Sequence, residues 1–293
     1  MNTLRDETAE PLRVIWFVPP AVALVARAMN LPVAVAVADT RATSSDAQFD
    51  ALSSGACDVV VTAMDNVFAW NRRAGPADFR IVAQIERTTP LTVIGRPGLK
   101  GLRDLQGADI LVDAPGNGFV VALRALLANA GLLDGSYRLK PSGGVKERLD
   151  GLLAKSGDAT LLGPPFDAVA VAAGYVLLAR VQDTYPGFPG QGVVVREGEL
   201  HRLRPRLQRW LAALEQARVQ MDDPAVAKAH LASSGAEASA IDPMLALRPL
   251  SLRPDRAGLD LLIEQRKRLG LPGSEDRYEN LVNDSLLAQR TEE

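Results

Sequence analysis

The sequence predicts an α/β protein with two lobes around a cleft, each lobe a mostly parallel sheet flanked by helices. Short apolar strands alternate with helical segments from the first strand onward, which is typical of parallel sheets. The alternation runs in two series in tandem, and a helical C-terminal tail broken by prolines follows them. The length of 293 residues is also more typical of two lobes than of one compact domain.

The first series begins with a buried-type strand. The pair Pro19-Pro20 opens the next helix, because proline is tolerated in a first helical turn. Ser44 is a typical N-cap for the second helix, which ends near Gly55. The expected order is strand 12–18, helix 19–29, strand 32–38, helix 44–55, strand 57–62, helix 67–73 and an extended segment from 79.

The second series follows two extended segments that flank Arg87 to Pro90. Glycines at 107 and 131 are expected to stop two of its helices. The expected order is helix 102–107, strand 109–112, helix 119–130, strand 137–140, helix 145–153, strand 159–162, helix 166–173 and strand 175–179. One more strand is expected over 193–195, and the chain after Glu199 is expected to be helical.

Charge and composition disfavour several classes of function. The formal net charge is −2 and no block of like charge occurs, so we expect no nucleic acid as a partner. The single cysteine, Cys57, allows no internal disulfide and no iron–sulfur cluster, and it is expected to be an inert buried thiol. No His or carboxylate spacing matches a metal site. We therefore expect no metal and no cofactor.

The N-terminal segment predicts the compartment. It has neither a basic region nor an apolar run typical of an export signal. Later apolar runs are far too short to span a bilayer, so no membrane insertion is expected. As written, the chain is expected to be soluble and cytoplasmic, and it would be periplasmic if a leader had been removed. A monomer or dimer is expected.

Four segments carry a resemblance to a known family. They are the stretch from Ala51 to Ala63, the spacing from Gly101 to Gly107, the glycine-rich turn after Asp113, and Leu161-Leu-Gly-Pro-Pro-Phe. Over about residues 12–220 the chain resembles the type II periplasmic substrate-binding proteins, in the sulfonate-, nitrate- and pyrimidine-precursor-binding branch of ABC importers.

The resemblance implies two lobes linked by two crossings of the chain, near 86–94 and 179–193. Residues 1–88 and 191–293 would then form lobe 1, and residues 89–190 would form lobe 2. It also implies a small-molecule ligand and, if the protein is exported, an ABC permease as partner.

The candidate site follows from sheet geometry. In open parallel α/β sheets, ligands bind at the carboxyl ends of strands, next to helix N-termini. This rule selects the loops 16–20, 62–66, 113–119 and 163–167. The candidate ligand-binding residues in and near these loops and the first crossing are Trp16, Phe17, Ser44, Thr62, Met64, Asp65, Asn66, Glu86, Arg87, Thr88, Asp113, Gly116, Asn117, Gly118, Phe119, Gly163, Pro164 and Phe166.

Aromatic and glycine residues suggest two kinds of ligand contact. Trp16, Phe17, Phe119 and Phe166 lie at or beside the loops although aromatic residues make up only 5% of the chain, so they could stack on a flat ligand or pack in the core. Gly116 and Gly118 precede a helix, where free N–H groups can hold an anion, or they simply form a tight turn.

The polar candidates are also open to two interpretations. Thr62 and Asn66 can bond polar ligand edges, whereas Asp65 is expected chiefly to cap a helix. Glu86 and Arg87, at the proposed hinge, could recognise a carboxylate or zwitterion, or form an exposed ion pair of little energetic weight.

These features predict a solute-binding protein that captures a small aromatic or heteroaromatic molecule, an anionic molecule, or one that is both, and closes over it. The alternative is a cytoplasmic enzyme on the same fold, a carbon–carbon or carbon–oxygen lyase such as a decarboxylase or dehydratase acting on a cyclic or aromatic carboxylate. Its acid–base residues would be drawn from Glu86, Asp113 and Asp65. A weaker third hypothesis is a ligand sensor that docks a partner through its C-terminal helices.

Overall fold

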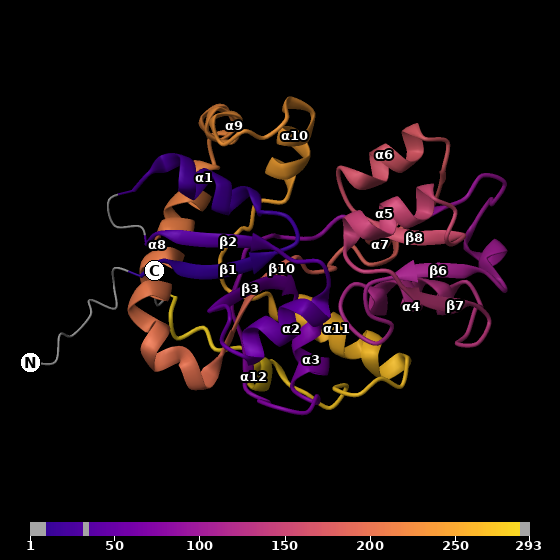
Figure 1. Ribbon diagram of the computed structural model, residues 1–293, viewed down its shortest axis with the longest axis horizontal. Coiled ribbons are helices and arrows are strands. Elements are labelled where there is room, and N and C mark those ends of the chain that lie inside the picture. The colour runs from indigo at the N-terminus through magenta and orange to yellow at the C-terminus, as the bar shows by residue number, and fades with distance from the viewer. Residues whose placement is uncertain (1–9, 32–34, 288–293) are drawn as a thin grey trace, which may run out of the picture.

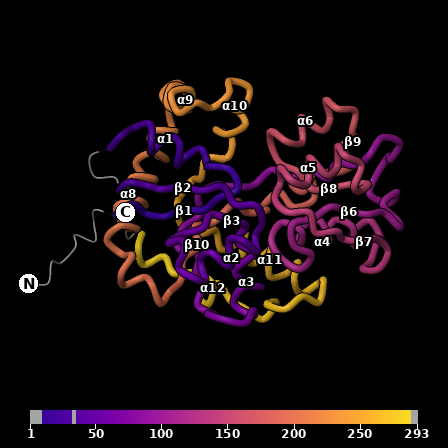
Figure 2. The backbone as a smooth tube through the Cα atoms, in the orientation of Figure 1, coloured from indigo at the N-terminus to yellow at the C-terminus, as the bar shows by residue number. Residues whose placement is uncertain are grey.

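The computed structural model describes residues 10–31 and 35–287, which form two α/β lobes (Figure 1). Each lobe has one five-stranded sheet with helices packed on it. In the backbone trace of Figure 2, the early strands and the late helices share lobe 1, and the middle of the chain forms lobe 2. The predicted fold class is therefore confirmed.

The sheet of lobe 1 contains β1 (Leu12–Trp16), β2 (Val37–Arg41), β3 (Val59–Ala63), β4 (Phe79–Gln84) and β10 (Gln191–Arg196). Its strand order is β2-β1-β3-β10-β4. The strand β1 pairs in parallel with β2 and β3, whereas β10 runs antiparallel to both β3 and β4. The helices of its first half are α1 (Ala21–Met29), α2 (Ser45–Ser53) and α3 (Asn66–Trp70).

The sheet of lobe 2 contains β5 (Thr92–Gly95), β6 (Asp109–Val112), β7 (Arg138–Pro141), β8 (Ala159–Leu162) and β9 (Val176–Arg180). Its order is β7-β6-β8-β5-β9, and β5 runs antiparallel to β8 and β9. Its helical segments are η1 (Leu102–Leu105), α4 (Val120–Asn129), α5 (Val145–Leu153), α6 (Phe166–Ala172) and α7 (Val181–Thr184).

The chain passes from lobe 1 to lobe 2 between β4 and β5, and it returns between α7 and β10. In each sheet the reversed strand is the one that directly follows a crossing. The two crossings touch, because a Cβ on Gly190 would lie 2.2 Å from the Glu86 carbonyl oxygen. The predicted lobe boundaries at 88/89 and 190/191 fall in these segments, and we retain them as a proposal.

The predicted second strand is placed too early. Residues 32–34 of the expected range 32–38 lie outside the described residues, and β2 begins only at Val37. This strand forms the edge of the sheet and four of its five residues are exposed. Its position is set by pairing of Val37 to Arg41 with β1, not by apolar alternation, which is why the sequence pattern misplaced it.

The C-terminal tail is helical, as expected, and packs on lobe 1. After η2 (Glu197–Glu199), its helices are α8 (Leu200–Gln220), α9 (Pro224–Ser233), α10 (Ala238–Ala246), α11 (Arg256–Arg268) and α12 (Tyr278–Leu281). Helices α8 and α9 pack against α1, and α11 packs against α4 of lobe 2. None of the helices in residues 10–31 and 35–287 combines the length and hydropathy that a membrane span requires.

The apolar core is divided unevenly. One cluster of buried side chains lies within lobe 1 around β1, α1 and α8, and a small one lies within lobe 2 around α5. A third cluster contains residues of both lobes, including Phe68 of α3, Leu123 and Leu127 of α4, and Leu259 and Leu262 of α11. The two lobes therefore share a continuous apolar core on the side where α4 and α11 meet.

Candidate functional site

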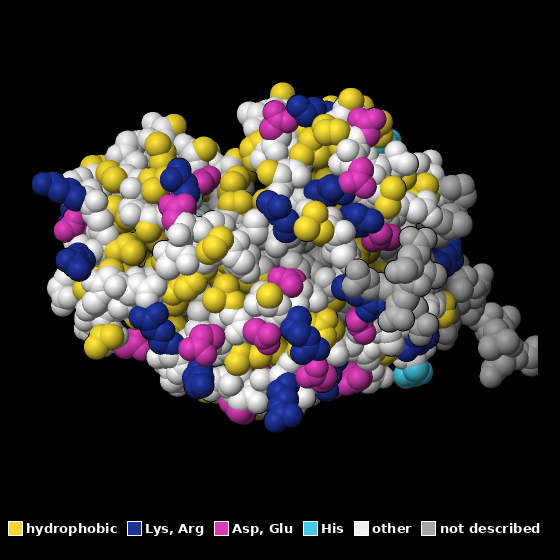
Figure 3. Space-filling view, turned by 180° about the vertical axis from the view of Figure 1, so that it is seen from behind, with side chains coloured by type: hydrophobic (Ala, Val, Ile, Leu, Met, Phe, Trp, Pro, Cys, Tyr) yellow, Lys and Arg dark blue, Asp and Glu magenta, His cyan; other side chains and the backbone are white. Residues whose placement is uncertain are grey.

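The strand ends of the two lobes face each other. Hydrogen bonds join the start of α2 in lobe 1 to Asp113 after β6, and join Asp65 after β3 to Gly118 before α4. Two of the loops selected from the sequence, 62–66 and 113–119, are thus brought to one boundary between the lobes. In the space-filling view of Figure 3 a notch separates the lobes at one side of this boundary, and Figure 1 shows α6 and α10 on its two sides.

Five residues close the other side of the boundary, and we call them the buried seam: Asp65, Asn66, Asn117, Gly118 and Arg266. Asn117 donates from Nδ2 to Asn66 Oδ1 at 2.5 Å, and Asn66 donates from its own Nδ2 to Thr62 Oγ1 at 2.7 Å. The Asn66 and Thr62 side chains are almost wholly buried. The two amides therefore hydrogen-bond to each other across the lobes, and the expected contact of Asn66 and Thr62 with a polar ligand edge remains a prediction.

Asp65 forms the charged centre of the buried seam. Arg266 of α11 donates to its two carboxylate oxygens at 2.7 and 2.6 Å, and Gly118 N–H donates to Oδ1 at 2.7 Å. Asp65 stands at the N-cap position of α3 but makes no capping hydrogen bond with its side chain. The expectation that it is chiefly a helix cap is wrong, because Arg266 and Gly118 take its oxygens. Burial raises the pKa of Asp65, and Arg266 opposes that shift.

Asp113 makes the second polar contact between the lobes. Both of its carboxylate oxygens accept from Ser45 N–H in the first turn of α2, at 3.2 and 3.1 Å. Ser44 caps the same helix by accepting from Ala47 N–H, as its residue type predicted. Burial raises the pKa of the Asp113 carboxyl. The protein's own carboxylate thus occupies a helix N-terminus at which a bound anion would otherwise be favoured.

Two buried polar atoms near this contact have no hydrogen-bond partner within the described residues. They are Ser45 Oγ in the first turn of α2 and Nε of Arg148, an arginine of α5. The Arg148 guanidinium donates from Nη1 to Gly143 O and from Nη2 to Leu161 O, and burial lowers its pKa. Buried polar atoms normally find a partner, so these two are sites where a ligand or water could bond.

The aromatic candidates separate into two groups. Phe17, Phe119 and Phe166 are partly exposed, and Phe17 packs against lobe 2, since a Cβ on Gly144 would lie 3.0 Å from its ring. Trp16 is buried in the core of lobe 1, and Phe119 packs on Phe188 with ring centroids 6.1 Å apart. Phe17, Phe119 and Phe166 are therefore the aromatic candidates that keep partly exposed surface.

Other candidates lie at the edges of the boundary. Met64 is buried and packs on Gly192, and Gly116 contributes only a weak carbonyl contact to Arg266 at 3.4 Å. Gly163 lies against the first crossing, because a Cβ there would be 2.9 Å from Pro90 O. The neighbouring Pro164 is exposed. The ligand-binding role of every candidate remains a prediction.

The first crossing holds Glu86 inside the protein. Its carboxylate accepts from Gln191 Nε2 at 3.1 Å and from Thr89 Oγ1 at 3.0 Å. The next two candidates in the chain are placed differently from Glu86. Arg87 is exposed, and Thr88 Oγ1 accepts from Gln182 Nε2 at 3.1 Å. Glu86 therefore joins the two crossings through Gln191. Within residues 10–31 and 35–287 it forms no ion pair with Arg87.

The Glu86 carboxyl predicts a pH dependence. Burial raises its pKa above the ordinary value of 4.5, so the folded state holds this proton more tightly than the unfolded chain does. Its stabilising contribution is full below the ordinary pKa and is lost as pH rises through the raised pKa. Glu86→Gln, which keeps the shape, should flatten this part of the profile. The check is the free energy of unfolding of both proteins against pH, and parallel profiles would contradict the assignment.

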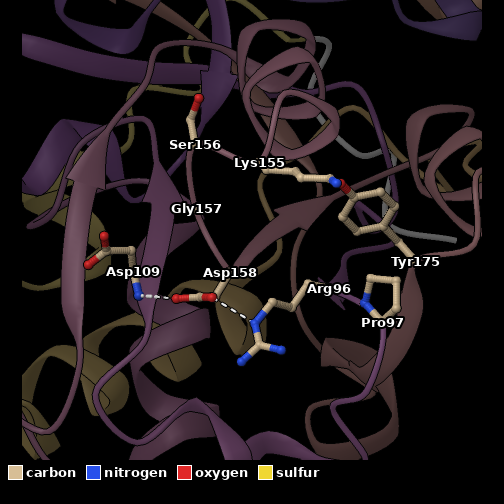
Figure 4. A pocket seen from close by; sticks show the side chains of 8 residues that line it. All are labelled: Arg96, Pro97, Asp109, Lys155, Ser156, Gly157, Asp158 and Tyr175. Atoms are coloured by element: carbon tan, nitrogen blue, oxygen red, sulfur yellow. Dashed lines mark hydrogen bonds and ion pairs between the residues drawn. The ribbon is translucent and has the colours of Figure 1, made fainter.

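Two cavities lie away from the boundary. One of about 340 Å³ is lined by Arg96, Asp109, Lys155, Asp158 and Tyr175, among others, at the amino ends of β6 and β8 (Figure 4). Its polar groups largely bond one another: Arg96 donates to Asp158, which accepts from Asp109 N–H. A second, of about 130 Å³, lies at the amino end of β3. Neither cavity is at the strand ends that the sequence selected.

Three residues that lie beside the candidate residues were not singled out from the sequence. Arg266 lies about two hundred residues from Asp65, and no local pattern marks it as the partner of a strand-end carboxylate. Arg148 and Phe188 likewise acquire their positions only through packing. Within the described part of the chain, no three His, Cys, Asp or Glu side chains are close enough together to hold a metal ion.

The fold matches solved structures over almost the whole chain. The periplasmic nitrate-binding protein NrtA from Synechocystis PCC 6803 has a TM-score of 0.78 at 12% identity, over 94% of this chain and 86% of that chain. The alkanesulfonate-binding protein SsuA from Xanthomonas axonopodis pv. citri, bound to MOPS, has a TM-score of 0.71 at 19% identity, over 89% of this chain and 94% of that chain.

A third match is the ligand-binding component of an ABC-type import system from Staphylococcus aureus with zinc bound. Its TM-score is 0.75 at 14% identity, over 94% of this chain and 97% of that chain. No protein-family model matches the sequence, and no curated protein matches it. The chain thus has the fold of the periplasmic binding proteins of ABC importers, as its sequence resemblance implied.

Proposed function

We propose that this protein is a solute-binding protein of the ABC-importer type, which captures a small molecule between its lobes. The observation that carries the proposal is the meeting of the strand-end loops of both lobes at one boundary with a notch beside it. Binding proteins with this fold and with TM-scores of 0.71 to 0.78 support it. If the protein is exported, its partner would be an ABC permease.

The ligand would be flat and small, held by one aromatic ring from each lobe. Phe17 of lobe 1 and Phe119 and Phe166 of lobe 2 are the partly exposed rings among the candidates. Ring stacking favours an aromatic or heteroaromatic ligand. An anionic group would avoid the Asp113 carboxylate and would have to bond elsewhere, for example at Arg148 Nε, which has no hydrogen-bond partner within the described residues.

The structure restricts the lyase alternative. Glu86 and Asp65 are both buried and bonded to the protein's own groups, so neither faces solvent. Asp113 is the one of the three acid–base candidates that is partly exposed. A lyase on this site would therefore depend on Asp113, whereas a binding protein needs no proton transfer.

The proposal is tested by mass spectrometry of small molecules that copurify under native conditions, followed by calorimetry with the molecule identified. We expect tight binding and recovery of the molecule unchanged. Chemical conversion that Asp113→Asn abolishes would instead establish the enzyme. Failure to find any bound molecule, in the protein as purified or in calorimetric screens of aromatic solutes, would remove the proposed function.

Phe17→Ala should weaken binding of that molecule by roughly two- to tenfold, which is the usual value of one aromatic pair. Leu133→Ala is the matched control, because Leu133 is exposed in lobe 2 outside the candidate loops. The measurement is the dissociation constant of the three proteins. Equal affinity of Phe17→Ala and wild type would show that this ring does not contact the ligand.

A further inference from the structure

A surface cavity of about 340 Å³ lies at the amino ends of β6 and β8, and we call it the distal cavity (Figure 4). Its lining comes from four separate segments of lobe 2, at residues 96–97, 109, 155–158 and 175. Asp113 lies beyond the opposite end of β6, so the distal cavity is separate from the boundary between the lobes. Its volume is within the usual range for sites that bind small molecules.

The two carboxylates of the distal cavity are already bonded. Asp158 accepts from Arg96 Nε at 2.8 Å and from the Asp109 N–H at 2.9 Å, with a different oxygen for each. Asp109 accepts from Arg138 Nε at 2.5 Å and from Lys140 Nζ at 3.4 Å. The hydrogen bond from Arg138 lowers the pKa of the Asp109 carboxyl, which is therefore ionised at neutral pH. Both negative charges of the cavity are thus held in ion pairs, which makes it a poor site for a further cation.

Two cationic groups of the distal cavity have donors that nothing accepts. Within the described part of the chain, the Arg96 side chain donates only through Nε, so Nη1 and Nη2 have no acceptor. The Lys155 ammonium forms no hydrogen bond and no ion pair within residues 10–31 and 35–287. With Arg138 and Lys140 included, four cations face two carboxylates, which leaves two positive charges in excess. This balance favours an anion as the occupant.

The backbone at Lys155 also sets this residue apart. Lys155 follows the C-terminus of α5 with a φ of +58°, in the left-handed conformation that glycine adopts most readily. Glycine occupies the same position after five other helices, as Gly55, Gly131, Gly174, Gly235 and Gly270. The preference of the backbone therefore does not account for a lysine here, which indicates a role for its side chain in the cavity.

A fixed aromatic ring stands beside Lys155. Tyr175 Oη donates to Leu152 O at 2.6 Å, and the same carbonyl oxygen accepts from Lys155 N–H at 2.9 Å. Figure 4 shows the Lys155 side chain extending toward this ring, with Pro97 nearby. The distal cavity therefore combines cationic donors with a flat, partly apolar wall.

We propose that the distal cavity binds a small molecule that carries a phosphate group, with Arg96 and Lys155 on the phosphate oxygens. A guanidinium can donate two parallel hydrogen bonds to a phosphate, and a lysine ammonium adds a point charge. A phosphate group carries about two negative charges near pH 7, which matches the two positive charges in excess. Tyr175 can stack on an organic part of the molecule. This site does not depend on the ligand proposed between the lobes.

The test is calorimetric titration of the full-length protein at low ionic strength with inorganic phosphate and, separately, with adenosine monophosphate. We expect binding that Lys155→Gln weakens by about fivefold or more, since one charged donor is lost. Lys146→Gln is the matched control, because Lys146 also lies on α5 but pairs with Asp150 outside the cavity. It removes the same charge and should leave the affinity unchanged. Tighter binding of adenosine monophosphate than of phosphate would identify a phosphate ester as the occupant, and equal affinity would identify free phosphate.

Lys155→Gly separates a binding role from a structural one. Glycine relieves the left-handed backbone conformation, so the midpoint of denaturation should not fall, whereas the affinity should fall as in Lys155→Gln. A glycine variant that binds as tightly as wild type would show that the Lys155 side chain does not contact the anion.

Three further results would overturn the site. They are the absence of binding of either probe, an equal loss of affinity in Lys146→Gln and Lys155→Gln, and an affinity that Phe17→Ala lowers but Lys155→Gln does not. The last result would place the probe between the lobes, so it would support the proposed function while removing the distal site. Phosphate binding that depends on Lys155, in a protein that captures nothing between its lobes, would have the opposite meaning.

Discussion

Arg266→Met is expected to lower the free energy of unfolding by about 3–5 kcal/mol, the usual effect of removing one partner of a buried ion pair. The substitution leaves the Asp65 carboxylate in the interior with only Gly118 N–H and no counter-charge. It also removes the Arg266 donation to Pro272 O at 2.6 Å. Chemical denaturation of both proteins measures the effect.

The double variant Asp65→Leu with Arg266→Met is the control for this result. With both charges removed, no buried ion remains unpaired, so the double variant should be clearly more stable than Arg266→Met alone. A loss of stability in the double variant equal to the sum of the losses in Asp65→Leu and in Arg266→Met would contradict the account. They would show that Asp65 is not left desolvated by the loss of Arg266.

Trp70→Ala is expected to cost about 3–5 kcal/mol of stability, as removal of a large buried aromatic side chain usually does. Trp70 is fully buried and packs between Phe49 and Phe79, with ring centroids 6.0 and 5.6 Å away. These rings belong to the apolar cluster that both lobes share. The loss should therefore appear in a single cooperative transition and not in one lobe alone.

Trp70→Phe should cost much less than Trp70→Ala. Within the described part of the chain the Trp70 indole N–H has no hydrogen-bond partner, so phenylalanine removes an unsatisfied buried donor as well as some volume. Denaturant titrations of the three proteins compare them. A Phe variant as unstable as the Ala variant would indicate that the indole nitrogen is bonded in solution.

Much of lobe 2 could be predicted from local sequence. The ranges 109–112, 145–153 and 159–162 coincide with β6, α5 and β8, because each is a short apolar run or amphipathic segment bounded by turn residues. The edge strand β2 could not, since its residues are mostly exposed and their position depends on pairing with β1. Local pattern also gave no sign that β5 and β10 run against their neighbours, because strand direction depends on how the crossings enter each sheet.

The candidate site was predictable as a set of loops but not as a set of contacts. The strand-end rule brought Asp65, Asn117 and Asp113 to one boundary without any structural information. It could not show that Asp65 and Asn117 are used to join the lobes, since that depends on Arg266 from α11 and on Asn66. Those partners are distant in the chain and are brought together only by tertiary packing.

Hydrogen exchange of the protein with and without its copurified molecule tests the central claim most directly. We expect slower exchange on binding in segments 16–20, 44–48 and 163–167, which border the boundary between the lobes, and no change around Lys155 at the far edge of lobe 2. Protection confined to the segments around Arg96 and Lys155, with none at the strand ends, would place the ligand in the distal cavity and contradict the account.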